Sequence, residues 1–181
     1  MRIGYGWDSH EFRAGVPLKI GGIELPHDQG LAGHSDGDVL LHALTDALLG
    51  AVAAGDIGSY FPSSDPKWKG ADSVIFLNEA LRQVGKAGYA VANVDSTLIL
   101  AAPKIGPHAG AIQARVAELL RISPGQVGVK AKTPEGMGTD HAAIAHVTVL
   151  LAKAPRQRKP GAAVKRTGVK RPGVKPRSRR F

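Results

Sequence analysis

Three side chains have the types and the spacing of a metal site. Asp8 and His10 lie two residues apart at the predicted end of a short strand, so both point to the same side. His42 lies about two turns into a predicted helix. One carboxylate and two imidazoles match a zinc site with three protein ligands, whose fourth position stays open for a substrate oxygen. The sequence therefore indicates zinc on Asp8, His10 and His42.

Plainer interpretations of the same residues exist. An aspartate at a strand end often has a surface histidine beside it, with no metal between them. Asp46, four residues after His42, makes a common surface pair with a helical histidine. Alternatively, Asp46 accepts a hydrogen bond from the second ring nitrogen of His42 and fixes its tautomer.

The run from Gly33 to Asp38 leads into the helix that carries His42. Free N–H groups and positive potential at a helix start suit a phosphate group. Ser35 and Asp38 also have the spacing of a capping box, which is a structural role. His34 has no evident structural role, which favours a functional one.

The elements that must position these residues alternate between strands and helices. Glycines 21 and 22 separate two short apolar runs and predict a two-residue hairpin turn. Residues 55–70 are rich in Gly, Pro, Ser and Asp and predict a loop. Residues 142–151 are apolar on both faces, so we expect both faces of that strand to be covered. The predicted strands are 3–7, 16–20, 23–25, 91–100, 127–132 and 142–151, and the predicted helices are 35–54, 72–86 and 107–121.

Composition narrows the class of protein. Cysteine is absent, so there are no disulfides and any metal must be held by histidines and carboxylates. No stretch approaches the roughly 18 apolar residues of a membrane span. The N-terminus lacks the apolar run of a secretory signal. We therefore expect a cytoplasmic protein that is not bound to a membrane.

The net charge of +9 is distributed unevenly. Residues 153–181 hold 12 of the 24 basic residues and no acid, whereas residues 1–152 hold 12 basic and 15 acidic groups. A Val-, Pro- and Gly-containing basic repeat begins at Val164 and cannot form a core, so we expect a disordered tail at 153–181 after one domain at 1–152. Such a tail is a solubilising segment or a weak, salt-sensitive binder of polyanions.

Five motifs, in order, carry a resemblance to a known family. They are R-I-G-Y-G-W-D-S-H at the start, H-S-D-G-D-V-L-L-H-A-L-T-D-A-L-L-G-A from His34, G-D-I-G-S-Y-F-P-S-S-D-P from Gly55, N-V-D-S-T-L-I-L-A-A-P-K-I from Asn93 and K-A-K-T-P-E-G from Lys130. Over residues 1–152 the chain resembles the 2-C-methyl-D-erythritol 2,4-cyclodiphosphate synthases of the non-mevalonate isoprenoid pathway.

The resemblance implies an α/β (α+β) fold, in which a small mixed sheet carries helices on its outer face. It implies a homotrimer with the three sheets packed around a threefold axis and the active sites between neighbours. The implied substrate is the cytidine diphosphate-linked 4-diphosphocytidyl-2-C-methyl-D-erythritol 2-phosphate. Its 2-phosphate attacks the β-phosphorus, expels CMP and closes a cyclic diphosphate, so no protein nucleophile is needed.

The resemblance also assigns roles to residues of this chain. Zinc on Asp8, His10 and His42 grips the β-phosphate, and a second divalent cation, magnesium or manganese, takes Glu135 as its protein ligand. His34 and Thr133 are the implied catalytic residues, which stabilise charge in the transition state. The implied substrate-binding residues are Asp8, Ser9, His10, His34, Ser35, Asp56, Ile57, Gly58, Phe61, Pro62, Ser63, Ser64, Asp65, Leu100, Ala101, Ala102, Pro103, Lys104, Ile105, Gly106, Lys132, Thr133, Pro134 and Glu135. Of these, residues 56–65 surround the methylerythritol group and residues 100–106 the cytosine.

The sequence departs from the family pattern at three places. Lys132 and Pro134 replace residues that are more often small or polar, which alters the edge of the pocket. Trp7 and Ser9 flank Asp8 where relatives usually have Tyr and Val. After Glu135 many relatives have an arginine that meets phosphate, whereas residues 138–142 here read Gly-Thr-Asp-His-Ala. Either Lys132 supplies the missing charge or phosphate binding is weaker.

Three other functions are compatible with the same residues. A zinc-dependent phosphohydrolase would use the same three ligands with water as the nucleophile. An RNA- or ribosome-associated module would depend on the basic tail. A metal-bound structural trimer would have no turnover.

Overall fold

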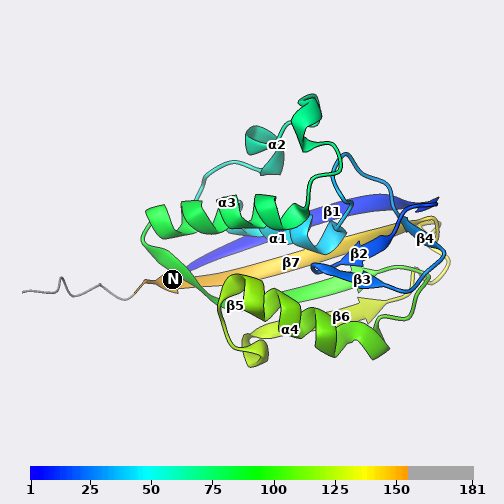
Figure 1. The fold of residues 1–181 in the computed structure, drawn as a ribbon. Helices are drawn as coiled ribbons and strands as arrows, with labels where there is room; N and C mark the ends of the chain where they lie inside the picture. The colour runs from blue at the N-terminus through cyan, green and yellow to red at the C-terminus, as the bar shows by residue number, and fades with distance from the viewer. Residues whose placement is uncertain (155–181) are drawn as a thin grey trace, which may run out of the picture.

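The computed structural model describes residues 1–154 of the 181-residue chain. A five-stranded sheet in the order β4-β1-β7-β5-β6 carries the helices on one face (Figure 1). The strands are β1 (Arg2–Ala14), β2 (Leu18–Ile20), β3 (Ile23–Leu25), β4 (Gln29–Leu31), β5 (Tyr89–Ile99), β6 (Val127–Lys132) and β7 (Ala142–Lys153). The helices are α1 (Val39–Ala51), α2 (Ile57–Tyr60), α3 (Ser73–Lys86) and α4 (Ala109–Leu120), with the 3₁₀ turns η1 (Pro66–Trp68), η2 (Gly106–His108) and η3 (Pro124–Gln126).

The sheet is mixed, which confirms the predicted fold class. β5 pairs with β6 in parallel, and the other neighbours pair antiparallel. β2 and β3 form a separate hairpin. Gly21 and Gly22 both have positive φ, +69° and +78°, so the predicted two-residue turn is confirmed.

Two glycines of β1 let α1 lie directly against the sheet. A Cβ atom added at Gly4 would come 1.9 Å from the Ala47 carbonyl oxygen, and one added at Gly6 would come 1.9 Å from the Ala43 carbonyl oxygen. Any side chain at either position would therefore push the helix away. Asp8 and His10 follow on the same face of β1, because successive side chains alternate along a strand.

Several predicted boundaries were wrong. β1 does not end before Asp8 but continues to Ala14, because Phe12, Arg13 and Ala14 pair with β4. α1 begins at Val39 rather than Ser35, since the carboxylate of Asp38 accepts the Leu41 N–H and is the N-cap. The predicted loop at 55–70 contains α2 and η1, which Asp56 and Asp65 cap.

The second and third predicted helices and the final strands lie where the sequence indicated, within about three residues. α3 is capped by Asp72, whose side chain accepts the Val74 N–H. β6 matches its prediction, and β7 continues two residues beyond the predicted end. Residues 155–181 of the predicted basic tail, and with them its predicted polyanion binding, lie outside the described residues.

One face of the sheet is left open by the described chain. Ile3, Tyr5 and Trp7 of β1 are 72%, 60% and 50% exposed on the side opposite α1. On β7, by contrast, the side chains that face the helices, such as Val147 and Val149, are buried. We predicted that both faces of β7 are covered. Within the described chain, only the face toward the helices is covered. Within residues 1–154, no helix combines the length and apolar character needed to cross a membrane.

Candidate metal centre and active site

Asp8, His10 and His42 form a triangle of potential ligand atoms. His10 Nε2 and His42 Nδ1 each lie 3.0 Å from Asp8 Oδ2, and the two nitrogens lie 3.0 Å from each other. Among residues 1–154 these three form the one group of at least three such side chains that could hold a metal ion. The structure therefore brings the predicted zinc ligands together from β1 and α1.

The donor set fits a zinc ion. Tetrahedral zinc with bonds of about 2.0–2.1 Å holds its ligand atoms about 3.3 Å apart. The observed 3.0 Å edges are close to that spacing. Two imidazoles and a carboxylate leave a fourth position for an exogenous oxygen, which is the arrangement of catalytic zinc.

The two histidines also control the charge of Asp8. Burial alone would raise the pKa of the Asp8 carboxyl, but hydrogen bonds and positive charge from His10 and His42 outweigh it and hold that pKa well below its usual range. Asp8 is therefore a carboxylate at neutral pH, the form that binds a cation.

The predicted partner of His42 was wrong. Asp46 does not face the imidazole, because its Oδ1 accepts the backbone N–H of Ile57 at 2.7 Å and anchors the start of α2. The second ring nitrogen, His42 Nε2, lies instead 2.9 Å from Ser73 Oγ and 3.0 Å from Ser35 Oγ.

A cavity of about 290 Å³ opens beside the metal centre. His34 points its Nε2–H at the carbonyl oxygen of Asp65, at 3.2 Å, and so lies on the wall formed by residues 61–65. Asp56 and Asp65 are both acidic side chains whose pKa is lowered by hydrogen bonds, from Ser59 and from Lys67 respectively. The predicted residues that line this cavity are His10, His34, Ser35, His42, Ile57, Gly58, Phe61 and Ser63, whereas Asp56, Pro62, Ser64 and Asp65 lie beside it in the sequence.

The other predicted residues gather in a second cavity, of about 470 Å³. Thr133 and Glu135 meet there, with the Thr133 hydroxyl donating to Glu135 Oε1. The predicted residues lining it are Leu100, Ala101, Pro103, Lys104, Ile105, Gly106, Lys132, Thr133 and Glu135, with Ala102 and Pro134 next to them in the chain.

The two cavities share no lining residue. The described chain therefore does not bring Thr133 and Glu135 to the metal centre that contains His42. Ser9 is also separated from it, because alternation along β1 points Ser9 to the face opposite Asp8 and His10.

Sequence reasoning missed residues that contact the centre. Ser73 was read only as the start of a helix, although it is fully buried and touches His42. Trp68 and Phe76 line the cavity beside the metal centre, and their rings pack edge to face. The available signal was the G-A-D-S run from Gly70 to Ser73, where the predicted loop ends and the predicted helix begins.

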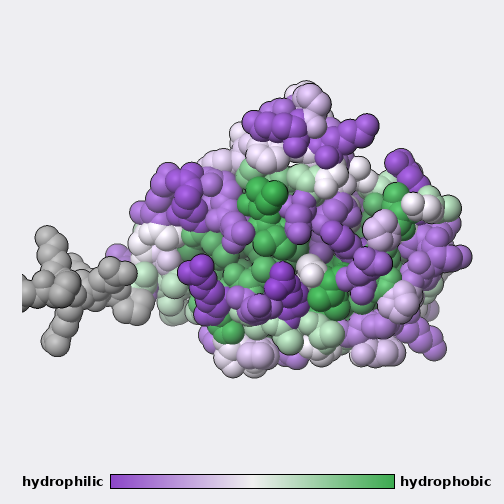
Figure 2. Space-filling view, in the orientation of Figure 1, coloured by the Kyte–Doolittle hydropathy of each residue, from purple (hydrophilic) through white to green (hydrophobic). Residues whose placement is uncertain are grey.

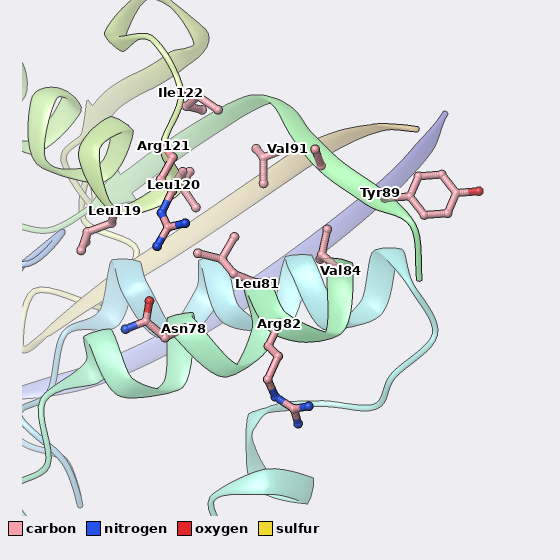
Figure 3. Close-up of a pocket in the computed structure, with 11 residues that line it drawn as sticks. Asn78, Leu81, Arg82, Val84, Tyr89, Val91, Leu119, Leu120, Arg121 and Ile122 are labelled. Atoms are coloured by element: carbon pink, nitrogen blue, oxygen red, sulfur yellow. The ribbon is translucent and has the colours of Figure 1, made fainter. Parts of the chain in front are cut away.

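Another cavity, of about 490 Å³, lies elsewhere, between α3, β5 and the end of α4 (Figure 3). Leu81, Val84 and Leu120 provide apolar lining, and apolar surface is visible between α3 and α4 in Figure 2. Arg82 points away from the cavity and pairs with Glu79. None of the predicted site residues lines this cavity, so its size does not make it the candidate site.

The mixed sheet with one helical layer and the group of Asp8, His10 and His42 define a small α/β protein with a candidate metal site. The model of the YgbB family matches residues 1–152, and the chain belongs to the YgbB family.

Named relatives agree with that assignment. The 2-C-methyl-D-erythritol 2,4-cyclodiphosphate synthase of Koribacter versatilis (strain Ellin345) is 68% identical over 153 residues, which cover 84% of this chain and 99% of that enzyme. A solved structure of a 2C-methyl-D-erythritol-2,4-cyclodiphosphate synthase has 45% identity and a TM-score of 0.79, with coverage of 83% of this chain and 100% of that one. Another, in a form bound to CDP, has 43% identity, the same TM-score and the same coverage. The resemblance seen in the sequence is confirmed.

Proposed function

We propose that this chain catalyses the 2-C-methyl-D-erythritol 2,4-cyclodiphosphate synthase reaction. The substrate is 4-diphosphocytidyl-2-C-methyl-D-erythritol 2-phosphate, and the products are the cyclic diphosphate and CMP. The observation that carries the proposal is the Asp8, His10 and His42 triangle in a chain that is 68% identical to an enzyme of that name. The CDP-bound relative supports a cytidine diphosphate-linked substrate.

The reaction is an intramolecular phosphoryl transfer. An oxygen of the 2-phosphate forms a bond to the β-phosphorus, and the bond from that phosphorus to the bridging oxygen breaks, so that CMP leaves with the electron pair. The protein need only position the two phosphates and offset their charge. A zinc ion on Asp8, His10 and His42 would supply Lewis-acid polarisation of a phosphate oxygen.

Residues around the metal centre would orient the methylerythritol diphosphate. His34 directs an N–H toward the cavity wall at Asp65 and would turn it to a phosphate oxygen as charge develops. Asp56 is exposed and ionised at neutral pH, because hydrogen bonds from Ser59 lower its pKa, and it would accept from substrate hydroxyls. Aromatic side chains at Phe61, Trp68 and Phe76 would exclude water from this end.

The second cavity would hold the cytidine end. Backbone groups of residues 100–106 would satisfy the hydrogen-bonding edge of cytosine, and Lys104 would face the phosphates. The Thr133 hydroxyl would donate a hydrogen bond to an oxygen of the transferred phosphoryl group. Glu135 would ligate the second divalent cation, magnesium or manganese.

A homotrimer would unite the two cavities. The open sheet face exposes the apolar side chains of Ile3, Tyr5 and Trp7, and further copies of the chain would cover them. Packed around a threefold axis, one subunit would place its Thr133 and Glu135 near the metal centre of its neighbour. A cytoplasmic location, the domain at 1–152 and the basic tail at 153–181 are parts of the same proposal.

The test is product identity with the diphosphocytidyl substrate. We expect the cyclic diphosphate and CMP in equal amounts, and loss of both in His42→Ala. A linear bisphosphorylated product would instead establish a zinc-dependent phosphohydrolase. No turnover from a folded, zinc-loaded trimer would establish a structural protein. A variant that ends at Ala154 is expected to keep turnover, because every residue of the proposed site lies before it.

A further inference from the structure

A chain of hydrogen bonds runs from the surface to the outer nitrogen of His42. Lys19 Nζ, from β2, lies 3.2 Å from Asp36 Oδ2. Asp36 Oδ1 accepts the Ser73 hydroxyl at 2.5 Å and the Ser73 backbone N–H at 3.2 Å. Ser73 Oγ in turn lies 2.9 Å from His42 Nε2. We refer to Lys19, Asp36 and Ser73 as the His42 relay.

We propose that the His42 relay positions His42 for the metal by fixing which of its ring nitrogens carries the proton. This role rests on the proposed metal site and assigns a function to Ser73 and Asp36 within it. Neither residue faces the reacting atoms, so both are positioning residues.

The donor and the acceptor of each hydrogen bond in the relay follow from which groups carry a proton. A carboxylate has only acceptor sites, and a serine hydroxyl has one proton. Asp36 takes that proton, so Ser73 can offer only a lone pair to His42. His42 Nε2 must then be a donor. In the metal-free chain Nδ1 also donates to Asp8, and a bound cation would replace that Nδ1 proton while Nε2 keeps its own. Nδ1 is the atom that lies 3.0 Å from both Asp8 Oδ2 and His10 Nε2.

The relay is built into the fold rather than lying loosely on the surface. Ser73 is 0% exposed at the first turn of α3. The Asp36 N–H donates to the Ala71 carbonyl, and the Gly70 N–H donates to the His34 carbonyl, so the two loops are held together. Lys19 forms an ion pair with Asp36 and so joins β2 to this loop. The second acceptor at Nε2 is Ser35 Oγ, at 3.0 Å.

Removing such an outer partner of a metal-binding histidine typically costs 10–100-fold in metal affinity. For Ser73→Ala we expect the zinc dissociation constant of the full chain to rise about tenfold, because Ser35 still accepts from Nε2. For the double variant Ser35→Ala/Ser73→Ala we expect about a hundredfold rise. Asp36→Asn should weaken zinc binding about as much as Ser73→Ala. An amide can donate as well as accept, so the Ser73 hydroxyl would no longer have to give its proton to residue 36.

The experiment measures zinc affinity by competition with a chromogenic chelator, using Zn²⁺ alone as the probe. Ser96→Ala is the matched control, because Ser96 is also a buried serine whose hydroxyl has one strong partner, the Gly128 carbonyl at 2.7 Å, remote from the metal centre in the sheet. A second readout is the imidazole Nε2–H proton of His42 in the zinc-loaded protein, seen by NMR. We expect slow exchange with solvent in the wild type and fast exchange in the double variant.

The outcomes separate the relay from the metal site itself. Weaker zinc binding in Ser73→Ala and Asp36→Asn, with Ser96→Ala unchanged, supports the relay. Zinc affinity within twofold of wild type in both folded variants overturns it while leaving the proposed function intact. A wild-type chain that binds no zinc overturns the proposed function, and the relay with it.

Discussion

At the scale of single residues, the candidate metal centre depends on three polar groups that contact one another, of which His42 is buried and Asp8 and His10 are half-buried. The triangle of Asp8, His10 and His42 comes from two elements, and each histidine contacts the carboxylate. Charged or polar groups away from water are tolerated only when their partners are present. The same rule governs Asp38, which lies four residues before His42.

Asp38 connects the start of α1 to the hairpin turn. Its carboxylate is 0% exposed and accepts three backbone N–H groups, from Gly21 at 2.9 Å, Gly22 at 2.6 Å and Leu41 at 3.0 Å. Burial raises the pKa of Asp38 although these hydrogen bonds oppose the shift. Asp38 is therefore a structural residue, because three backbone N–H groups would lose their hydrogen-bond acceptor without it.

Replacing Asp38 with alanine is expected to lower the free energy of unfolding by about 2–4 kcal/mol, because buried donors are left unpaired. The measurement is urea denaturation. Asp72→Ala, which removes the exposed N-cap of α3, is the matched control and should cost only about 1 kcal/mol. Equal losses in the two variants would refute the structural role assigned to Asp38.

At the scale of elements, the close approach of α1 to β1 delivers His42 to Asp8 and His10. Gly4 and Gly6 face the Ala47 and Ala43 carbonyl oxygens with no room for a side chain. The helix contributes small residues on that side, among them Ala43, Ala47 and Ala51, all buried. The small residues of β1 and of α1 thus set the distance between His42 on the helix and Asp8 and His10 on the strand.

Gly6→Ala should separate α1 from β1, because its Cβ would lie 1.9 Å from a backbone oxygen that cannot rotate away. We expect a loss of at least about 2 kcal/mol of stability from overpacking, together with weaker zinc binding. Calorimetry and zinc titration on the same samples check both. Gly50→Ala is the control, since its added Cβ has its nearest neighbour at 4.0 Å and should leave stability within about 1 kcal/mol of wild type. Unchanged zinc affinity in Gly6→Ala would contradict this account.

Elements with local signals were predictable from the sequence. The Gly21-Gly22 turn and the start of α3 at Asp72 depend on neighbouring residues, and both are confirmed. Contacts between distant segments were not predictable in the same way. Ser73 meets His42 across 31 positions, and Asp46 turns to Ile57 rather than His42, because the tertiary fold decides which donor reaches each side chain.

The grouping of Asp8, His10 and His42 was predictable because few residue types bind metal ions. The capping role of Ser35 was wrong because Asp38 competes for the same helix start and is supported by the hairpin turn. No local pattern predicted that the two cavities lie apart in one chain. Only the family resemblance implied it, through active sites between neighbouring subunits.

At the scale of the whole molecule, the described chain leaves its sheet half covered. The apolar side chains of Ile3, Tyr5 and Trp7 lie on the open face, and Tyr5 is hydrogen-bonded to His146 at 2.8 Å. The proposed trimer would bury this face and join the two cavities. The candidate metal group of Asp8, His10 and His42, by contrast, lies within one chain.

The variant Ile3→Glu should therefore lose turnover while it keeps zinc binding. A charge on the open face should break the trimer, so light scattering is expected to give a lower mass and the turnover rate to fall, while one zinc per chain is retained. Ile75→Glu is the control, because Ile75 is also an exposed isoleucine, at 47%, but lies on α3 away from the open face. An Ile3→Glu trimer with full activity would show that this face is not the interface.

Removal and restoration of zinc, with analysis of the product, tests the central claim most directly. The chelated, folded full chain should form no cyclic diphosphate from the diphosphocytidyl substrate, and adding Zn²⁺ in the presence of Mg²⁺ should restore the cyclic diphosphate and CMP together. Formation of the cyclic diphosphate at an undiminished rate by protein shown to be free of zinc would contradict a catalytic metal at Asp8, His10 and His42.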